Sequence, residues 1–151
     1  MTLWAYALAA WERPGVSKAC LRLQDRHGQC VVLLLWGAWA AIEGRNVDIP
    51  TTRSAVALAR TWESDVIAPL RAARRALGTA AEVTDDEARD LARAAELDAE
   101  HTLMNALEAL TPPPSSVERV GGLGRQLAAL MGIWNGSRAE TLAFSLAAAL
   151  R

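Results

Sequence analysis

A run of 13 residues with no charged or strongly polar side chain, Cys30 to Ile42, constrains the fold more than any other part of the sequence. A helix needs about 20 apolar residues to cross the ~30 Å hydrocarbon layer of a membrane, so this run is too short to span one. A helix that is apolar on every side has to be buried on every side. The run therefore predicts a central helix that the rest of the chain surrounds.

Elsewhere the apolar residues recur at intervals of three and four, which is the spacing of a helix face. A buried strand at Val31 to Leu35 is the alternative at one place, but no second strand-like run accompanies it. Pro69 lies inside a long helical pattern and predicts a kink near Asp65 to Ala68. The expected helices run from about Thr2 to Glu12, from Val16 to a left-handed cap at Gly28, from Thr51 or Thr52 to a cap at Gly78, from Thr84 to Leu110, from Leu123 to Trp134 and from Ser137 to Arg151.

The fold class that follows is all-α: a single domain over residues 1–151, built as a bundle of about six to seven helices around Cys30 to Ile42. A Pro- and Gly-rich connection at 111–122 precedes the two C-terminal helices. Cys20 and Cys30 have apolar neighbours in the sequence, so we expect reduced core residues. The first residues carry no signal-peptide pattern, which favours a cytoplasmic protein.

A net charge of −1 conceals a regional imbalance. Residues 79–110 carry nine acidic side chains against two Arg, whereas residues 1–78 carry ten Lys or Arg against six acidic side chains. An acidic helix packed across basic neighbours explains this pattern, and a basic face left free for an acidic partner is the alternative. Helical spacing places the basic residues in two stripes on outer helix faces, namely Lys18, Arg22 and Arg26, and Arg71, Arg74 and Arg75.

The densest polar cluster comes directly before the apolar run and contains Gln24, Asp25 and His27. An amide, a carboxylate and an imidazole at the mouth of a buried helix suit a polar ligand or acid–base chemistry. The same cluster suits the capping of unpaired backbone groups at two helix ends. Six Trp residues offer the walls of a pocket for a flat or apolar ligand, although Trp at helical spacing is more typical of a core.

Metal and nucleotide sites are not indicated. Asp98 and His101 lie three residues apart on the expected acidic helix, but a helical metal site needs a second set of ligands, and the sequence has only two His. The Gly-rich segment at 121–124 follows no strand and lacks the Lys of a nucleotide loop. We therefore expect no catalytic residue, metal or cofactor from these patterns. The basic stripes have no exposed aromatic residues between them, which disfavours single-stranded nucleic acid and leaves phosphate contact open.

One further pattern spans residues 3–77. Its most specific part is Leu23-Gln24-Asp25, Gly28, Leu33-Leu34-Leu35 and Trp39, and it extends to Trp4, Pro14-Gly15-Val16, Val31, Trp62, Pro69-Leu70-Arg71 and Arg74. In this pattern the chain resembles a bacterial family of small proteins of unknown function. The resemblance implies an all-helical cytoplasmic protein and leaves the activity open. Cys30 and Val32 stand where the family has Asp and Asn, which argues against a shared polar site there.

Two functions are compatible with these features. The first is a non-enzymatic adaptor that presents the basic stripes to an acidic protein. Self-association through an exposed part of the Leu-rich or Ala-rich helices is compatible with this function and with the alternative. The alternative is a small-molecule binder or enzyme that uses Gln24, Asp25 and His27 beside a Trp-lined pocket. The candidate binding residues are Lys18, Arg22, Gln24, Asp25, Arg26, His27, Arg71, Arg74 and Arg75.

Overall fold

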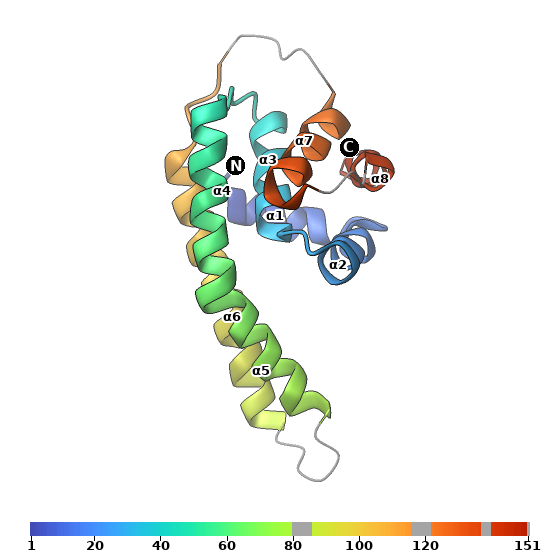
Figure 1. The fold of residues 1–151 in the computed structure, drawn as a ribbon, viewed down its shortest axis with the longest axis vertical. Helices are drawn as coiled ribbons and strands as arrows, with labels where there is room; N and C mark the ends of the chain where they lie inside the picture. The colour runs from blue at the N-terminus through green and yellow to red at the C-terminus, as the bar shows by residue number, and fades with distance from the viewer. Residues whose placement is uncertain (80–85, 116–121, 137–139, 151) are drawn as a thin grey trace.

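The computed structural model of the chain describes residues 1–79, 86–115, 122–136 and 140–150. Regular structure in these residues is helical, which confirms the predicted all-α fold class. The helices are α1 (Leu3–Trp11), α2 (Val16–His27), α3 (Val31–Ile42), α4 (Ile49–Trp62), the π-helical turn η1 (Glu63–Ile67), α5 (Ala68–Thr79), α6 (Asp86–Leu110), α7 (Leu123–Asn135) and α8 (Glu140–Ala149). Helices α4, η1 and α5 follow one another without a break and form one rod (Figure 1), so the nine described segments make seven helices.

Helix α3 is the predicted central helix, and nine of its 12 residues are buried. The indoles of Trp36 and Trp39 are among the largest fully buried side chains of the protein. Trp36 Nε1 donates a hydrogen bond of 2.8 Å to Thr111 Oγ1, so its one polar atom is satisfied inside the core. Helix α7 packs closely on α3 at Gly37, where a Cβ atom would overlap Leu130 Cδ1.

The rod changes register at η1, where the amide of Ala68 donates to the carbonyl of Glu63, five residues earlier. Pro69 comes next and has no amide hydrogen, so the α-helical bond to the carbonyl of Asp65 cannot form. The irregularity predicted near Asp65 to Ala68 therefore takes the form of a π-helical turn. One extra residue in a turn rotates the following helix by roughly 100° about its axis, which changes the side chains that α5 directs toward α6.

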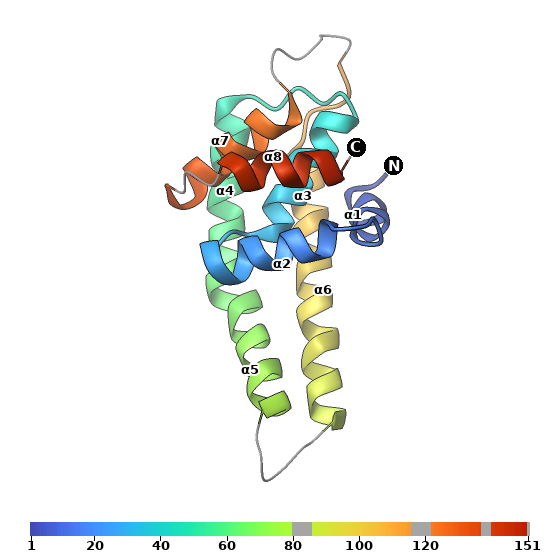
Figure 2. The same ribbon diagram turned by 90° about the vertical axis from the view of Figure 1, so that its right-hand side faces the viewer.

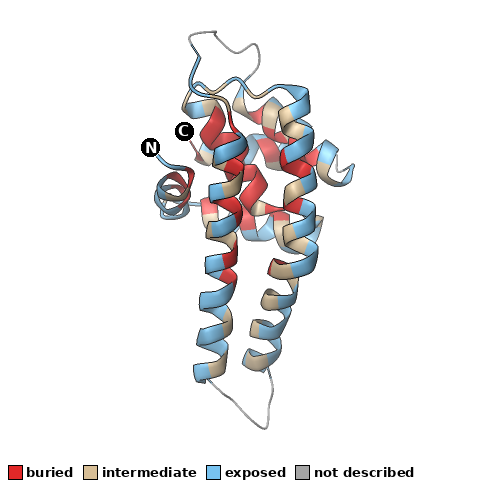
Figure 3. Cartoon of the chain, turned by 90° about the vertical axis from the view of Figure 1, so that its left-hand side faces the viewer, coloured by how far each residue is buried: buried red, intermediate tan, exposed pale blue. Residues whose placement is uncertain are grey.

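Two regions of the molecule differ in what they bury. We call α5 with residues 86–97 of α6 the arm, and the remaining helical segments the body. The arm extends beyond the body in Figure 1, while Figure 2 shows α2 and α8 running across the direction of α4 and α6. Buried residues gather in the body (Figure 3). Helix α5 contains no buried residue, and the buried residues of α6 begin only at Glu96.

Some local predictions are confirmed. Thr2 caps α1, because its side chain accepts a hydrogen bond of 3.2 Å from the amide of Ala5. Gly28 closes α2 with a φ of +58°, in the left-handed region that favours glycine. Cys20 and Cys30 are free thiols and both are buried, as expected for core residues.

Other boundaries differ from the prediction. Helix α4 begins at Ile49 rather than at Thr51 or Thr52, because the Asp48 carboxylate accepts a hydrogen bond of 2.8 Å from the amide of Thr51 and supplies the cap. Gly78 lies inside α5 rather than after its end. The caps expected at Thr84 and Ser137 lie outside the described residues.

Helix α6 has 25 residues, which is long enough to cross a bilayer, but it is rich in charged side chains. Among the described helices, none has both the length and the apolar character that a membrane span requires. Within the described residues, no group of three or more His, Cys, Asp or Glu side chains is placed to hold a metal ion.

Candidate functional site

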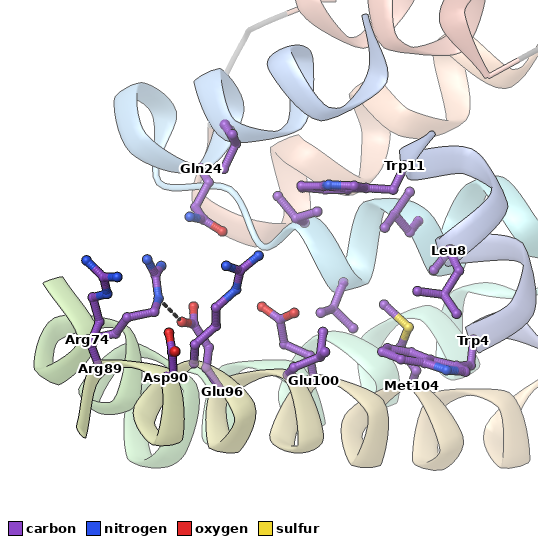
Figure 4. A pocket seen from close by; sticks show the side chains of 17 residues that line it. Trp4, Leu8, Trp11, Gln24, Arg74, Arg89, Asp90, Glu96, Glu100 and Met104 are labelled. Carbon is purple, nitrogen blue, oxygen red and sulfur yellow. Dashed lines mark hydrogen bonds and ion pairs between the residues drawn. The ribbon is translucent and has the colours of Figure 1, made fainter. Parts of the chain in front are cut away.

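A cleft of about 640 Å³ lies between α1, α2 and α3 on one side and α5 and α6 on the other (Figure 4). We call it the α1–α6 cleft. Its volume lies in the range of small-molecule sites, about 300–1,000 Å³. The apolar residues that line it are Trp4, Ala7, Leu8, Trp11, Leu21, Val31, Val32, Leu35, Leu97 and Met104. The polar and charged residues that line it are Gln24, Arg74, Arg89, Asp90, Arg93, Glu96 and Glu100.

These two kinds of residue are separated along the cleft. Helix α6 forms the floor, and the order of its side chains in Figure 4 is Asp90, Glu96, Glu100 and Met104. At the apolar end, which contains Trp4, Leu8, Trp11 and Met104, the cleft is covered by α1. The opposite, charged end contains Arg74, Arg89 and Asp90. The cleft is therefore amphipathic along its length.

The walls of the cleft expose large apolar side chains. Leu8 is 50% exposed, Leu21 is 45% exposed and Leu97 is 48% exposed. The indole of Trp4 is held by a stacked contact with the His101 ring, with 4.3 Å between the ring centroids and 24° between the planes. Apolar side chains that converge on one hollow without covering one another provide the driving force for an apolar ligand.

A network of charged side chains, of which Glu96 is buried and the others are partly buried, joins the cleft floor to the rod. The Arg71 side chain is 11% exposed and contacts Glu63 at 2.7 Å, Glu96 at 2.9 Å and Glu100 at 3.6 Å. Arg74 Nε lies 2.6 Å from the second carboxylate oxygen of Glu96. Two guanidinium groups thus face three carboxylates. Glu100 has the longest of these contacts and is the least well neutralised member of the network.

Burial raises the pKa of Glu100 from its ordinary value of 4.5 to about 7, and the neighbouring Glu96 and Glu63 carboxylates raise it further against the opposing effect of Arg71. Glu100 is thus close to half protonated at neutral pH. A carboxyl group that titrates near neutral pH in a cleft is a candidate for ligand binding or for proton transfer.

The predicted polar cluster is divided by the structure. Gln24 lines the cleft. Asp25 instead forms an ion pair of 2.7 Å with Arg75, and this hydrogen bond lowers the pKa of Asp25. The main-chain carbonyl of His27 accepts a hydrogen bond of 2.8 Å from Asn135 Nδ2, at the end of α2. Asp25 and His27 are not among the described residues that line the cleft.

The predicted outer basic stripe on α5 is wrong for Arg71 and Arg74. Both direct their guanidinium groups toward α6, where they pair with its carboxylates. The π-helical turn is the physical reason, because after it Ile67, Arg71 and Arg74 share the inward face. Arg75 does remain exposed, but Asp25 neutralises it. The acidic segment of the sequence therefore packs against basic neighbours at this place.

The predicted basic stripe on α2 does lie on an outer helix face. Lys18, Arg22 and Arg26 lie one turn apart on α2 and are exposed. These three side chains form no ion pair in the part of the chain that the structure describes.

Most residues of the cleft were not found from the sequence. Leu8 and Leu97 belong to helices that are far apart in the chain, and only the fold brings them together. Glu96 and Glu100 could have been recognised from the sequence. The inward-facing positions of α6 recur every three or four residues, and when they are followed from Leu107 toward the N-terminus through Leu103 and Ala99 they reach a carboxylate. A charged residue at such a position indicates a buried ion pair or a site.

Comparison with known proteins places the chain in a family. Residues 2–107 match the family described as protein of unknown function (DUF2390). The chain belongs to this family. The match agrees with the resemblance seen over residues 3–77 and extends it along α6. All the residues that line the α1–α6 cleft fall inside the matched segment, whereas α7 and α8 fall outside it. No curated protein and no solved structure matches the chain.

Proposed function

We propose that the protein binds a small amphipathic molecule in the α1–α6 cleft. The single observation that carries this proposal is the cleft itself, about 640 Å³ in volume, with exposed apolar side chains at one end and charged side chains at the other. Leu8 and Trp11 contribute exposed apolar surface to the cleft. A ligand that covers this surface is stabilised by roughly 25 cal/mol for each Å² that is removed from water. The charged end would orient the ligand.

A neutral probe tests the cleft without assuming the charge of the ligand. Octan-1-ol titrated into the protein in a calorimeter is expected to bind with saturation and with a negative heat-capacity change, because apolar surface is buried. Leu8→Asn is expected to weaken binding by about five- to tenfold, because it replaces an apolar wall with an amide.

The matched control is Leu91→Asn. Leu91 is also an exposed helical leucine, but it does not line the cleft. We expect this variant to bind octan-1-ol like the unchanged protein. Equal effects of the two substitutions, or no saturable binding to the unchanged protein, would rule the proposal out.

The exposed stripe on α2 supports a second candidate function, an adaptor that binds an acidic protein. Lys18, Arg22 and Arg26 present three like charges on one helix face, which favours encounter with an acidic surface. The double change Arg22→Glu with Arg26→Glu is expected to abolish binding to a polyglutamate peptide at low salt and to leave the melting temperature nearly unchanged. Arg53→Glu, at an exposed position on α4, is the control. A large loss of stability in the double variant would assign the stripe to the fold.

A further inference from the structure

The position of Glu100 along the cleft decides which chemical group of a ligand it meets. Glu96, Glu100 and Met104 follow one another at intervals of four on α6, so they lie on one face about 6 Å apart along the helix. Glu100 is the ionisable lining residue next to the apolar end, and Glu96 lies beyond it (Figure 4). A ligand whose apolar part fills that end therefore places its polar group against Glu100.

The positive charges around Glu100 do not fully neutralise its carboxylate. The carboxylates that face it come from η1 (Glu63) and from the preceding turn of α6 (Glu96), and the guanidinium groups come from α5 (Arg71 and Arg74). Arg71 is held by its shorter contacts to the other two carboxylates and reaches Glu100 only at 3.6 Å. The side chains that α1 and α3 direct into the cleft are apolar, and α2 supplies the neutral amide of Gln24.

We propose that the α1–α6 cleft selects a cationic amphiphile, with a protonated amine against the Glu100 carboxylate and an alkyl or aryl group between Trp4, Leu8 and Trp11. This inference rests on the proposed function and names its ligand class. An ammonium group supplies the positive charge that the network lacks, and its hydrogen bonds to a carboxylate are charge-assisted. Trp4 and Trp11 at the same end can contact an alkyl or aryl group, and an aromatic ring face also attracts a cation.

Arg93 also lines the cleft, two turns before Glu100 on α6, but it forms no ion pair with Glu100 in the described part of the chain. Besides burial, the charges that shift the pKa of Glu100 come from Glu96, Arg71 and Glu63. Arg89 lies one turn before Arg93 and pairs with Asp86 at 3.3 Å, and Arg74 pairs with Glu96. Along α6, the ionisable lining residue that lies next to the apolar end is thus an acid.

Proton linkage gives the proposal a signature of its own. The pKa of Glu100 is about 7, so its carboxylate is mostly protonated at pH 6 and mostly ionised at pH 8. A primary alkylamine stays protonated over this whole range. Its affinity is therefore expected to rise roughly five- to tenfold from pH 6 to pH 8, with proton release on binding below neutral pH.

The test uses three probes of equal chain length: octylamine, octan-1-ol and octanoate, each titrated into the full chain in a calorimeter at pH 6 and pH 8. Octylamine is expected to bind most tightly at pH 8 and octanoate least tightly. Glu100→Gln is expected to lower the affinity for octylamine by about tenfold relative to the affinity for octan-1-ol, because the amide can still form a hydrogen bond with a hydroxyl group but carries no charge. Asp98→Asn removes one exposed charge from the same helix outside the cleft and is expected to change neither.

The outcomes separate the two proposals. If octan-1-ol binds but octylamine binds no more tightly than octanoate, or shows no increase from pH 6 to pH 8, the cationic selectivity is overturned and the cleft remains a binding site. If none of the three probes binds, the proposed function itself fails. The pH comparison on the unchanged protein keeps the test decisive even if Glu100→Gln does not fold.

Discussion

The body and the arm of this protein are stabilised by opposite kinds of side chain. In the body, α3 buries Trp36 and Trp39 among apolar neighbours, and the rest of the core follows the same principle. In the arm, α5 has no buried residue and the interior contact is a set of ion pairs around Arg71 and Glu96. The α1–α6 cleft lies where the two regions meet, and this origin explains why it is apolar at one end and charged at the other.

The largest effect is expected from a change inside the body. Trp36→Ala removes a fully buried indole and leaves Thr111 without its hydrogen-bond donor. Large-to-small changes of this kind cost about 4 kcal/mol of the free energy of unfolding. Urea unfolding followed by circular dichroism measures the loss. A loss below about 1 kcal/mol would show that the body does not depend on its apolar core.

A change in the arm is expected to act locally and less strongly. Glu96→Gln leaves Arg71 and Arg74 without their shared carboxylate, and the Arg71 side chain, which is only 11% exposed, is poorly compensated by water. We expect a loss of about 2 to 3 kcal/mol. Hydrogen exchange should increase in α5 and residues 86–97 before it increases in α3. Equal increases in both regions would contradict the division between body and arm.

Stability is expected to depend on pH through Glu100. Its pKa in the folded protein, about 7, lies above the ordinary value of 4.5, so the folded state binds more protons between these values. Stability is therefore lost as the pH rises from about 4.5 to about 7, by roughly 3 kcal/mol. Glu100→Gln should remove this decline. Thermal melts of both proteins at pH 5 and pH 8 measure the difference, and parallel curves would exclude Glu100 as its source.

The smallest effect is expected at the surface of the arm. Arg75 and Asp25 form an ion pair between side chains that are about half exposed. Arg75→Gln should cost less than about 1 kcal/mol, and the cost should vanish at high salt. Thermal melts in low and high salt check this. A larger loss that persists in salt would mean that this pair holds the arm against α2.

The sequence was most informative where one physical effect dominated. Cys30 to Ile42 is apolar throughout, which predicted a buried helix, and the structure confirms burial for nine of the 12 residues of α3, while Ile42 at its end is exposed. The direction in which the Arg71 side chain points could not be predicted from the sequence in the same way. It depends on the single extra residue of η1, and periodic patterns assume a regular turn.

The candidate site was only partly predictable for a related reason. Gln24 was identified because it stands beside a helix end, and it does line the cleft. Asp25 and His27 shared that sequence signal, yet a helix separates neighbours by about 100°, and the two residues are used elsewhere. Trp4 and Met104 meet across a contact of α1 with α6 that nothing local in the sequence encodes.

Methyl NMR of the three methionines reports directly on whether a ligand binds in the α1–α6 cleft. Met104 lines the cleft, Met131 is fully buried in the body, and Met1 is exposed at the N-terminus. With ¹³C-labelled methionine methyl groups, addition of octan-1-ol is expected to shift the Met104 signal to saturation and to leave Met131 unchanged. Leu8→Asn should reduce that shift and Leu91→Asn should not. An unchanged Met104 signal, or equal shifts of Met104 and Met131, would contradict a ligand site between the body and the arm.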